Sequence, residues 1–519
     1  MTNTNQKEPN QFTGWRAKLW PIHSFEMKKF LPLAFILFCL LFNYTLLRDT
    51  KDTLIINSAG ANVLPYLKGI VVTSAAILFV ILYSKATNIF SRENLFYVVV
   101  VPFLIFFGLF GFVIYPMADY LHPSASTIKS WYLAAPWAIG IIDIIAYWTY
   151  SLFYVMSEIW GSAMVALVFW QFANHIVRIS ESKRFYGLLA VIANFSLVLS
   201  GTMVKFCSED IQNFVPEGVD YFTVSMYILM GTVVVFGFSA IATYRWMHQN
   251  VLNDKKYYDP VEQAGAPKKK KEKPSLKESF KIIMSSPELL FIALLIVAYG
   301  VTINLVEVQW KHQLGVFFNG DKIKYNAYMG DFSRANGIIA ILFGLFIGSN
   351  ILRTFSWFSS AAITPIVTFV GGTFLFLFII SKDLVEPLLA ILSTDKVTAA
   401  CALGFIVVVF AKSVKYTLFD PTKEMAYLPL NEELKSKGKA AVDVIGGRLG
   451  KAAGGWAQMF LFTVFMTKDV VAIAPAAFGA FVLVATGWLL AVKVLSKKVA
   501  VAQERKRLEV EALKAKSES

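Results

Sequence analysis

Apolar runs of about 20 residues recur along the whole chain, and polar or charged stretches separate them. At about 1.5 Å per residue, a helical run of this length crosses a bilayer core of about 30 Å. The pattern predicts about twelve spans, near residues 29–48, 65–85, 95–116, 147–174, 186–206, 221–244, 288–310, 335–352, 360–381, 397–417, 449–467 and 473–494. The predicted fold class is therefore all-α integral membrane protein.

One apolar stretch does not fit a simple crossing. Residues 131–147 read "WYLAAPWAIGIIDIIAY", in which Pro136 and Asp143 interrupt the apolar run. Irregular backbone and a carboxylate at membrane depth are tolerated only where protein or a water-filled cavity surrounds them. We therefore expect an interfacial or re-entrant segment that leads into the fourth span.

The composition agrees with a membrane protein, because 56% of the residues are hydrophobic, 16% are charged and the mean hydropathy is +0.57. The net charge of +14 comes largely from loops, above all from residues 251–279 with the run Lys268 to Lys271. Cytoplasmic loops carry the excess of Lys and Arg, so both termini are predicted to be cytoplasmic. Lipid headgroups attract such charges, and a nucleic-acid partner is not expected.

The polar stretch in the middle divides the spans into six and six. The predicted organisation is a cytoplasmic N-terminal segment at 1–28, a six-helix half at 29–246, a basic linker at 247–285, a second six-helix half at 286–495 and a charged tail at 496–519. "SLFYVMSE" at 151–158 and "TLFDPTKE" at 417–424 share Leu, Phe and Glu in register. Repeated six-helix halves are typical of major-facilitator-like transporters, whose substrate site lies between the halves near the bilayer midplane.

Enzyme chemistry has no support in the sequence. The three cysteines and five histidines lack metal-binding spacing, so no metal or cofactor is predicted. The stretch "GGRLGKAAGG" at 446–455 has the Gly-Lys pair of a phosphate-binding loop, but Ile445 and Ala452 stand where that motif needs Gly and Ser or Thr. No catalytic residues are predicted.

Charged residues inside apolar spans are the strongest functional signal. Each costs about 2.5 to 3.5 kcal/mol near the bilayer centre, so it usually serves an ion, a substrate or a partner charge. Glu158 lies within the fourth span, and Glu307 and Lys311 share one face of the seventh. The alternatives are a Glu158 ion pair that only joins helices, and a Glu307–Lys311 pair at the interface with a snorkelling lysine.

Four charges follow the first apolar run in "FNYTLLRDTKDTL". We expect Arg48 and Lys51 to form one cationic wall of a cavity, and Asp49 and Asp52 to hold these cations while the cavity is empty. The other wall is expected to carry Lys311, Lys423 or Lys451. Lysine and arginine contact phosphate oxygens through charge-assisted hydrogen bonds, so such a cavity suits a polyanion.

Three further features complete the predicted site. Pro421 is expected to break the tenth helix beside Lys423, and broken helices commonly line binding cavities. Lys451 opens the eleventh span among glycines, where a helix start also attracts anions. The mid-span amide of Asn194 is a candidate for a hydrogen bond to a nucleobase edge, with interhelical bonding as the alternative.

At these residues the chain resembles a known family. "FNYTLLRDTKDTL", "LFYVMSEIWGS", "INLVEVQWK" and "LFDPTKEMAYLPL" with "KGKAAVDV" are similar to signature segments of the ATP/ADP translocases, the nucleotide transporters of plastids and obligate intracellular bacteria. The similarity runs from about residue 20 to 495. One departure is the segment "NSAGANVLPYLKG", which follows the first motif where many relatives carry a more Gly/Pro-rich loop.

The resemblance implies a twelve-helix facilitator-like fold and a function. That function is import of ATP in exchange for ADP, sometimes with phosphate, across the inner membrane of an energy-parasitic intracellular bacterium, because no transit peptide is evident. A proton-coupled importer of several nucleotides is the alternative. The resemblance also implies functional roles for Lys51, Glu158 and Glu307 and for one lysine of the second half, which is Lys423, Lys439 or Lys451.

Overall fold

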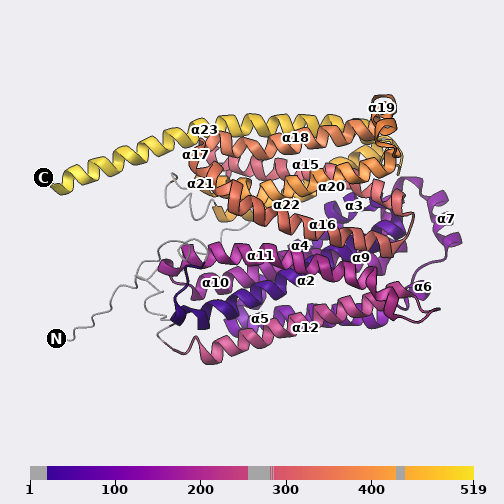
Figure 1. Cartoon of the computed structure of the whole chain (residues 1–519), viewed down its shortest axis with the longest axis horizontal. Helices are drawn as coiled ribbons and strands as arrows, with labels where there is room; N and C mark the ends of the chain where they lie inside the picture. Colours follow the sequence, from indigo (N-terminus) through magenta and orange to yellow (C-terminus); the bar gives the residue numbers. More distant parts are fainter. Residues whose placement is uncertain are drawn as a thin grey trace.

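The computed structural model describes residues 20–254, 257, 281, 283–284, 286–427, 430 and 439–518. All regular elements within these ranges are helices, and the label η marks short 3-10 or π-helical segments. They run roughly side by side in a long bundle, with the start of α2 and the end of α23 at the same end of it (Figure 1). The predicted linker at 247–285 lies largely outside the described residues, so its boundaries remain a prediction.

The N-terminal group of helices, drawn from indigo to magenta, forms one side of the bundle (Figure 1). It consists of η1 (Ser24–Glu26), α2 (Met27–Ala59), η2 (Ala61–Val63), α3 (Leu64–Tyr66), η3 (Leu67–Val72), α4 (Thr73–Ile89), α5 (Arg92–Leu109), η4 (Phe110–Ile114), α6 (Ala118–Leu121), α7 (Ala125–Ala134), η5 (Pro136–Ala138), α8 (Ile139–Ala146), α9 (Trp148–Trp160), η6 (Gly161–Phe169), α10 (Trp170–Ile176), α11 (Ile179–Ser208), η7 (Asp210–Phe214) and α12 (Tyr221–Asn250).

The C-terminal group, drawn in orange and yellow, forms the other side (Figure 1). It consists of α15 (Pro287–Phe318), α16 (Lys322–Leu342), η8 (Phe343–Gly348), α17 (Ser349–Thr354), α18 (Trp357–Ile380), α19 (Lys382–Leu392), α20 (Lys396–Val414), η9 (Lys415–Phe419), α21 (Asp420–Tyr427), α22 (Lys439–Val464) and α23 (Ala474–Glu518).

Within the described ranges, eleven helices are long and apolar enough to cross a membrane. The count becomes twelve if the pair Ala118–Ala134 and Pro136–Ala146, bent by 111°, is one broken span. That bend falls at Pro136, where the sequence predicted a re-entrant or interfacial segment. The predicted span at 449–467 corresponds to α22, which is absent from the eleven because its glycines and polar residues make it less apolar. The chain is a multi-pass membrane protein with the predicted all-α fold.

Polar residues at the loop ends start several of these helices. The side chains of Ser91, Asp220, Asp321, Ser356 and Asp395 accept hydrogen bonds from backbone N–H groups in the first turns of α5, α12, α16, α18 and α20. The first N–H groups of a helix have no partner within the helix, so such caps fix where each helix begins.

The tenth span differs from its prediction. Residues 396–427 form one candidate span in which α20 passes through the π-helical turn η9 directly into α21. Pro421, which was expected to break the helix, is the second residue of α21. Proline is tolerated near the start of an α-helical segment because its missing N–H is not needed there. Pro421 is in this position because the π-helical turn η9, with a different hydrogen-bond spacing, separates α20 from α21.

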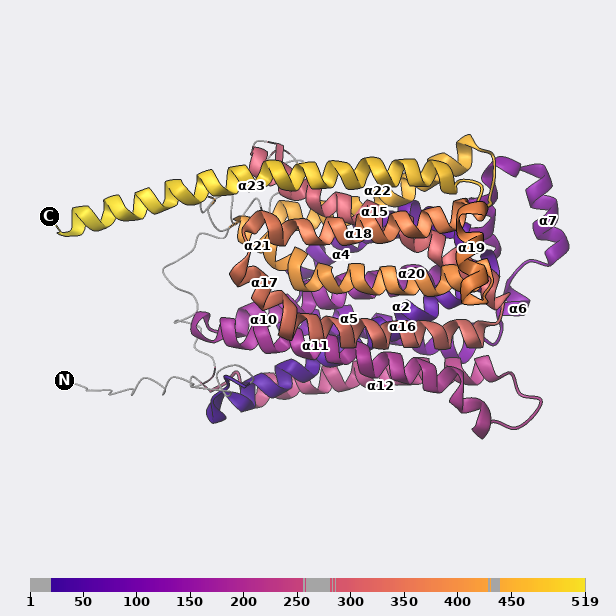
Figure 2. The ribbon, with the colours of Figure 1, turned by 45° about the horizontal axis from the view of Figure 1, so that its top comes forward.

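Glycines bring the two groups of helices into close contact, and both views place α11 beside α16 (Figures 1 and 2). A Cβ atom at Gly201 of α11 would lie 2.4 Å from the carbonyl oxygen of Gly330 of α16. A Cβ at Gly455 of α22 would lie 2.8 Å from the carbonyl oxygen of Pro65 at the start of the second span. Small residues allow such backbone approach between membrane helices, and here they form two seams between the groups.

Further contacts between the groups lie at the end of the bundle away from the termini. The Lys322 ammonium lies 5.8 Å from the Tyr115 ring centroid and 5.3 Å from that of Tyr150. The Lys468 ammonium lies 4.7 Å from the Tyr132 ring centroid. Both lysines belong to the C-terminal group and all three rings to the N-terminal group, so cation–π contacts join the groups at this end.

Candidate functional site

The charged turn that follows the first apolar run lies inside a helix. α2 continues for 33 residues to Ala59, about 50 Å at about 1.5 Å per residue, whereas the predicted span ended at Arg48. Likewise α15 continues to Phe318, past the predicted end at residue 310. The side chains of Asp49, Lys51 and Asp52 are 0%, 2% and 2% exposed. These charges are therefore buried within the bundle.

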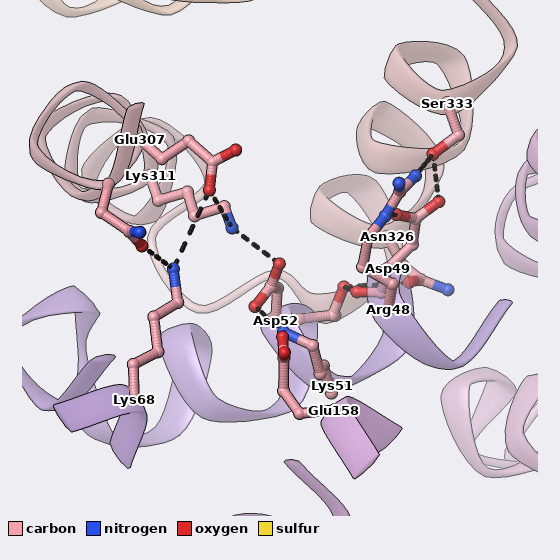
Figure 3. Close-up of polar contacts among 12 residues, drawn as sticks. Arg48, Asp49, Lys51, Asp52, Lys68, Glu158, Glu307, Lys311, Asn326 and Ser333 are labelled. Atoms are coloured by element: carbon pink, nitrogen blue, oxygen red, sulfur yellow. Dashed lines mark hydrogen bonds and ion pairs between the residues drawn. The ribbon is translucent and has the colours of Figure 1, made fainter. Parts of the chain in front are cut away.

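Lys51 links two carboxylates of the N-terminal group (Figure 3). Its Nζ lies 2.8 Å from Asp52 Oδ1 and 3.2 Å from Glu158 Oε1. The same ammonium lies 3.7 Å from the ring centroid of Tyr154, one turn before Glu158 on α9. Two carboxylates and an aromatic face thus surround the Lys51 charge, which makes a buried ammonium tolerable.

Asp52 connects the two groups of helices. Its Oδ2 lies 2.7 Å from Nζ of Lys311 on α15, and Lys311 Nζ lies 3.7 Å from Oε2 of Glu307 on the same helix. Glu307 and Lys311 therefore share one helix face, as predicted, and they form an ion pair there, as the alternative interpretation expected. Lys311 is 6% exposed, so it does not snorkel to an interface and its two carboxylate contacts are internal.

Glu307 is held by lysines from three different elements. Oε1 lies 2.8 Å from Lys412 of α20, while Oε2 lies 3.8 Å from Lys68 of η3 and near Lys311. Lys68 also donates a 2.8 Å hydrogen bond to Asn304 Oδ1. Lys68 belongs to the N-terminal group, so this contact is a second ion pair between the groups (Figure 3).

The other end of this network reaches solvent-accessible surface. Lys451 lies inside α22, which begins at Lys439, so it does not stand at a helix start as the sequence predicted. Its Nζ lies 3.3 Å from Glu158 Oε2, which forms another ion pair between the groups. The Lys451 side chain is 58% exposed, while Glu158 is 11% exposed. Lys451 therefore marks the accessible edge of the network.

Ion pairs join these residues into one alternating chain of charges. We call it the charge chain; its members, in order, are Lys451, Glu158, Lys51, Asp52, Lys311, Glu307, and then Lys412 and Lys68. Five ammonium groups face three carboxylates, so two positive charges are not balanced within the chain. A buried site with this excess favours an anion with several charged oxygens.

A second polar network lies beside the charge chain on α2. Arg48 Nε donates to Asp49 Oδ1 at 3.1 Å, as the sequence predicted, and Arg48 also donates to Ser333 Oγ of α16 at 2.7 Å. Ser333 in turn donates a hydrogen bond to Asp49. Thr53 of α2 donates a hydrogen bond to Asn326, which also lies on α16. Arg48 thus joins α2 to α16, and its charge is compensated by Asp49 (Figure 3).

Lys423 and Asn194 lie outside the charge chain, and the side chain of Lys439 is not among those that the structure describes. Lys423 lies on α21, and its described ion pair is with the neighbouring Glu424 at 3.6 Å. The backbone of Lys439 begins α22, but its side chain lies outside the described residues. Asn194 donates to the Ala190 carbonyl at 3.2 Å on its own helix and borders the seam at Gly337, whose added Cβ would lie 2.9 Å from the Asn194 carbonyl oxygen.

Sequence reasoning missed two members of the charge chain, Lys68 and Lys412. Each stands near one end of a predicted span, in "LPYLKGIVV" and "VVVFAKSVKY", where a snorkelling lysine is common. Nothing in these two segments alone distinguishes Lys68 and Lys412 from such snorkelling lysines. In the part of the chain that the structure describes, no group of His, Cys, Asp and Glu side chains is placed to hold a metal ion.

The arrangement of helices is shared with solved structures of other membrane proteins. The structure is similar to a D-xylose-proton symporter, with a TM-score of 0.56, 11% identity and coverage of 90% of this chain and 97% of that one. It is also similar to a bacterial homologue of the iron transporter ferroportin in an inward-facing state, with a TM-score of 0.55, 13% identity and coverage of 90% and 100%. The chain therefore has the fold of a transporter of major-facilitator type, as predicted.

Sequence comparison defines the family. Residues 5–499 match the family described as TLC ATP/ADP transporter, and the chain belongs to this family. It is 41% identical to ADP,ATP carrier protein 1 of Chlamydia pneumoniae over 96% of both chains. It is 40% identical to the carrier of the same name from Rickettsia conorii, over 96% of this chain and 98% of that one. The chloroplastic carrier of Arabidopsis thaliana is 40% identical over 96% of this chain and 78% of that one.

Proposed function

We propose that this protein exchanges ATP for ADP across a membrane by alternating access, with the charge chain as the site that binds the nucleotide phosphates. The single observation that carries the proposal is the excess of lysines over carboxylates in the charge chain, at the junction of the two groups of helices, in a member of the ATP/ADP transporter family. Ammonium groups provide charge-assisted hydrogen bonds to phosphate oxygens, and the carboxylates occupy them when no phosphate is bound.

Three of the ion pairs between the groups belong to the charge chain, and they support exchange over one-way release. They are Asp52–Lys311, Glu158–Lys451 and Glu307–Lys68. When a nucleotide dissociates, these ion pairs reform and hold the two groups of helices together. Separating the groups without a ligand would leave buried charges unpaired, and breaking one buried ion pair costs about 3 to 5 kcal/mol of stability. A phosphate that replaces the carboxylates removes this cost, so the loaded carrier changes state more readily than the empty one.

We further propose a location and an orientation. The similarity to carriers from Chlamydia pneumoniae and Rickettsia conorii supports a location in the inner membrane of an intracellular bacterium. Both termini are proposed to be cytoplasmic, because the lysine-rich segment around Lys268 would then lie on the cytoplasmic side. In this orientation the contacts of Lys322 and Lys468 lie at the outer end, where they join the two groups of helices.

The membrane potential is expected to affect exchange in a defined direction. ATP carries about four negative charges and ADP about three, so each cycle moves one net charge, worth about 2.3 kcal/mol per 100 mV. In liposomes that contain ADP, an inside-negative potassium-diffusion potential should slow ATP uptake. If phosphate leaves together with ADP, internal phosphate should make uptake insensitive to the potential.

The alternative, a proton-coupled importer of several nucleotides, makes the opposite prediction. Uptake accelerated by an inside-negative potential or by an inward proton gradient, without internal nucleotide, would favour that importer. Each carboxylate of the charge chain has lysine partners, which supports a phosphate site over a proton site at these carboxylates.

A further inference from the structure

Lys68 occupies an irregular part of the second span. It is the second residue of η3, a π-helical segment of six residues between α3 and α4. π-helical turns within α-helices are uncommon and occur frequently at functional sites, because they redirect side chains and leave carbonyl groups for other partners. In Figure 3 the Lys68 side chain extends from its own helix toward α15 of the opposite group.

The backbone of this segment is anchored to the C-terminal group. The Gly69 carbonyl accepts a 2.8 Å hydrogen bond from Trp456 Nε1 of α22. A Cβ at Gly69 would lie 2.9 Å from Trp456 Cδ1, and one at Gly455 would lie 3.0 Å from the Gly69 nitrogen. The segment that carries Lys68 is thus fixed against the same helix that carries Lys451.

Lys68 has the least compensated charge of the charge chain. Lys51, Lys311 and Lys412 each have a carboxylate oxygen within 2.8 Å, and Lys451 has one at 3.3 Å. The short contact of Lys68 is to a neutral group, Asn304 Oδ1 at 2.8 Å, while its carboxylate contact to Glu307 is 3.8 Å long.

Asn304 is held in the orientation that this contact needs. Its Nδ2 donates a 2.7 Å hydrogen bond to the Gly300 carbonyl, so the amide oxygen is the atom that faces Lys68. The Lys68 side chain is only 10% exposed. A buried ammonium without a close carboxylate carries a large desolvation cost, which an anionic ligand at this position would offset.

We propose that Lys68 is a substrate-binding residue that contacts a phosphate group of the transported nucleotide, and that Asn304 orients it for that contact. The proposal rests on the proposed function and adds a named residue to that site. When a phosphate enters, the Lys68 ammonium moves from its long contact with Glu307 to a phosphate oxygen, while Lys412 retains Glu307 Oε1 at 2.8 Å. The alternative is that Lys68 only joins the two groups of helices.

Two substitutions test this role by different routes. Lys68→Gln removes the charge but keeps a donor for Asn304, and Asn304→Asp places a carboxylate directly against Lys68, where it competes with phosphate. Binding of labelled ATP to the purified full-length protein is the readout. Both variants should raise the Kd for ATP about tenfold or more, equivalent to about 1.4 kcal/mol. Lys68→Arg, which retains the charge, should remain within about threefold of the unsubstituted protein.

Lys85→Gln is the matched control, since Lys85 is an exposed lysine of the same span. It should leave the Kd unchanged. The proposal is overturned if Lys68→Gln is folded and binds ATP as tightly as the unsubstituted protein. If Lys68→Gln cannot be purified, the proposal is overturned when folded Asn304→Asp binds ATP as tightly as the unsubstituted protein. If the unsubstituted protein itself neither binds nor exchanges ATP, the proposed function fails and this inference fails with it.

Discussion

Lys51→Glu is expected to abolish nucleotide exchange while the protein still inserts into the membrane. Lys51 contacts Asp52 at 2.8 Å and Glu158 at 3.2 Å, so the substitution would bring three carboxylates together in a buried position. The charge chain would change from an excess of two positive charges to none, and the carboxylates would repel phosphate. Exchange of labelled ATP in liposomes should fall at least about 100-fold, corresponding to about 2.7 kcal/mol or more in transition-state stabilisation.

Lys324→Glu provides the comparison for this experiment. The Lys324 side chain is 69% exposed and pairs only loosely, at 3.3 Å, with Asp321 in the same turn. Exposed pairs of this kind contribute about 1 kcal/mol or less, so exchange should stay near that of the unsubstituted protein. Similar losses from Lys324→Glu and Lys51→Glu would contradict a phosphate site centred on Lys51.

Glu307→Gln is expected to separate binding from transport. The carboxylate of Glu307 competes with phosphate for Lys68 and Lys311, and the amide would compete less. The Kd for ATP should therefore fall about tenfold, or about 1.4 kcal/mol. Exchange should nevertheless fall about 100-fold, because a tightly held nucleotide leaves slowly and because Lys68 and Lys412 have no carboxylate partner in the charge chain after it leaves.

Binding and exchange need to be measured on the same preparation of this variant. Glu288→Gln is the control on the same helix, since Glu288 is 28% exposed at the start of α15 and lies outside the charge chain. It should change neither quantity appreciably. A Glu307→Gln protein that binds ATP more weakly than the unsubstituted protein would mean that Glu307 positions the nucleotide rather than competing with it.

The sequence predicted the spans well because apolar runs report directly on burial in lipid. It did not predict how far the charged helices extend. Hydropathy ends the first span at Arg48, whereas α2 continues to Ala59. The charges of residues 48–52 are stabilised by partners from other helices, and a pattern confined to one segment contains no information on those partners.

For the site, the depth of a charge within its span was the useful signal. Glu158, Glu307 and Lys311 were selected on that basis, and the structure joins them with Lys51 and Asp52 in one network. Lys423 was selected beside Pro421, on the assumption of a broken helix, and the helix continues there.

Lys68 and Lys412 could not be assigned from the sequence, because their roles depend on contacts with a different helix. Lys68 contacts Asn304 and Glu307, more than 200 positions away, and Lys412 contacts Glu307 from the tenth span. The packing of α3 and η3 against α22, through Gly69 and Gly455, helps to bring Lys68 to this position.

The most direct test of the account is the dependence of ATP uptake on internal nucleotide. Purified protein is reconstituted in liposomes that are either empty or loaded with ADP, and uptake of external labelled ATP is followed. Because the ion pairs Asp52–Lys311, Glu158–Lys451 and Glu307–Lys68 oppose a change of state by the empty carrier, we predict rapid uptake into loaded liposomes and little into empty ones. Equal uptake into both would contradict exchange and require net import driven by another ion.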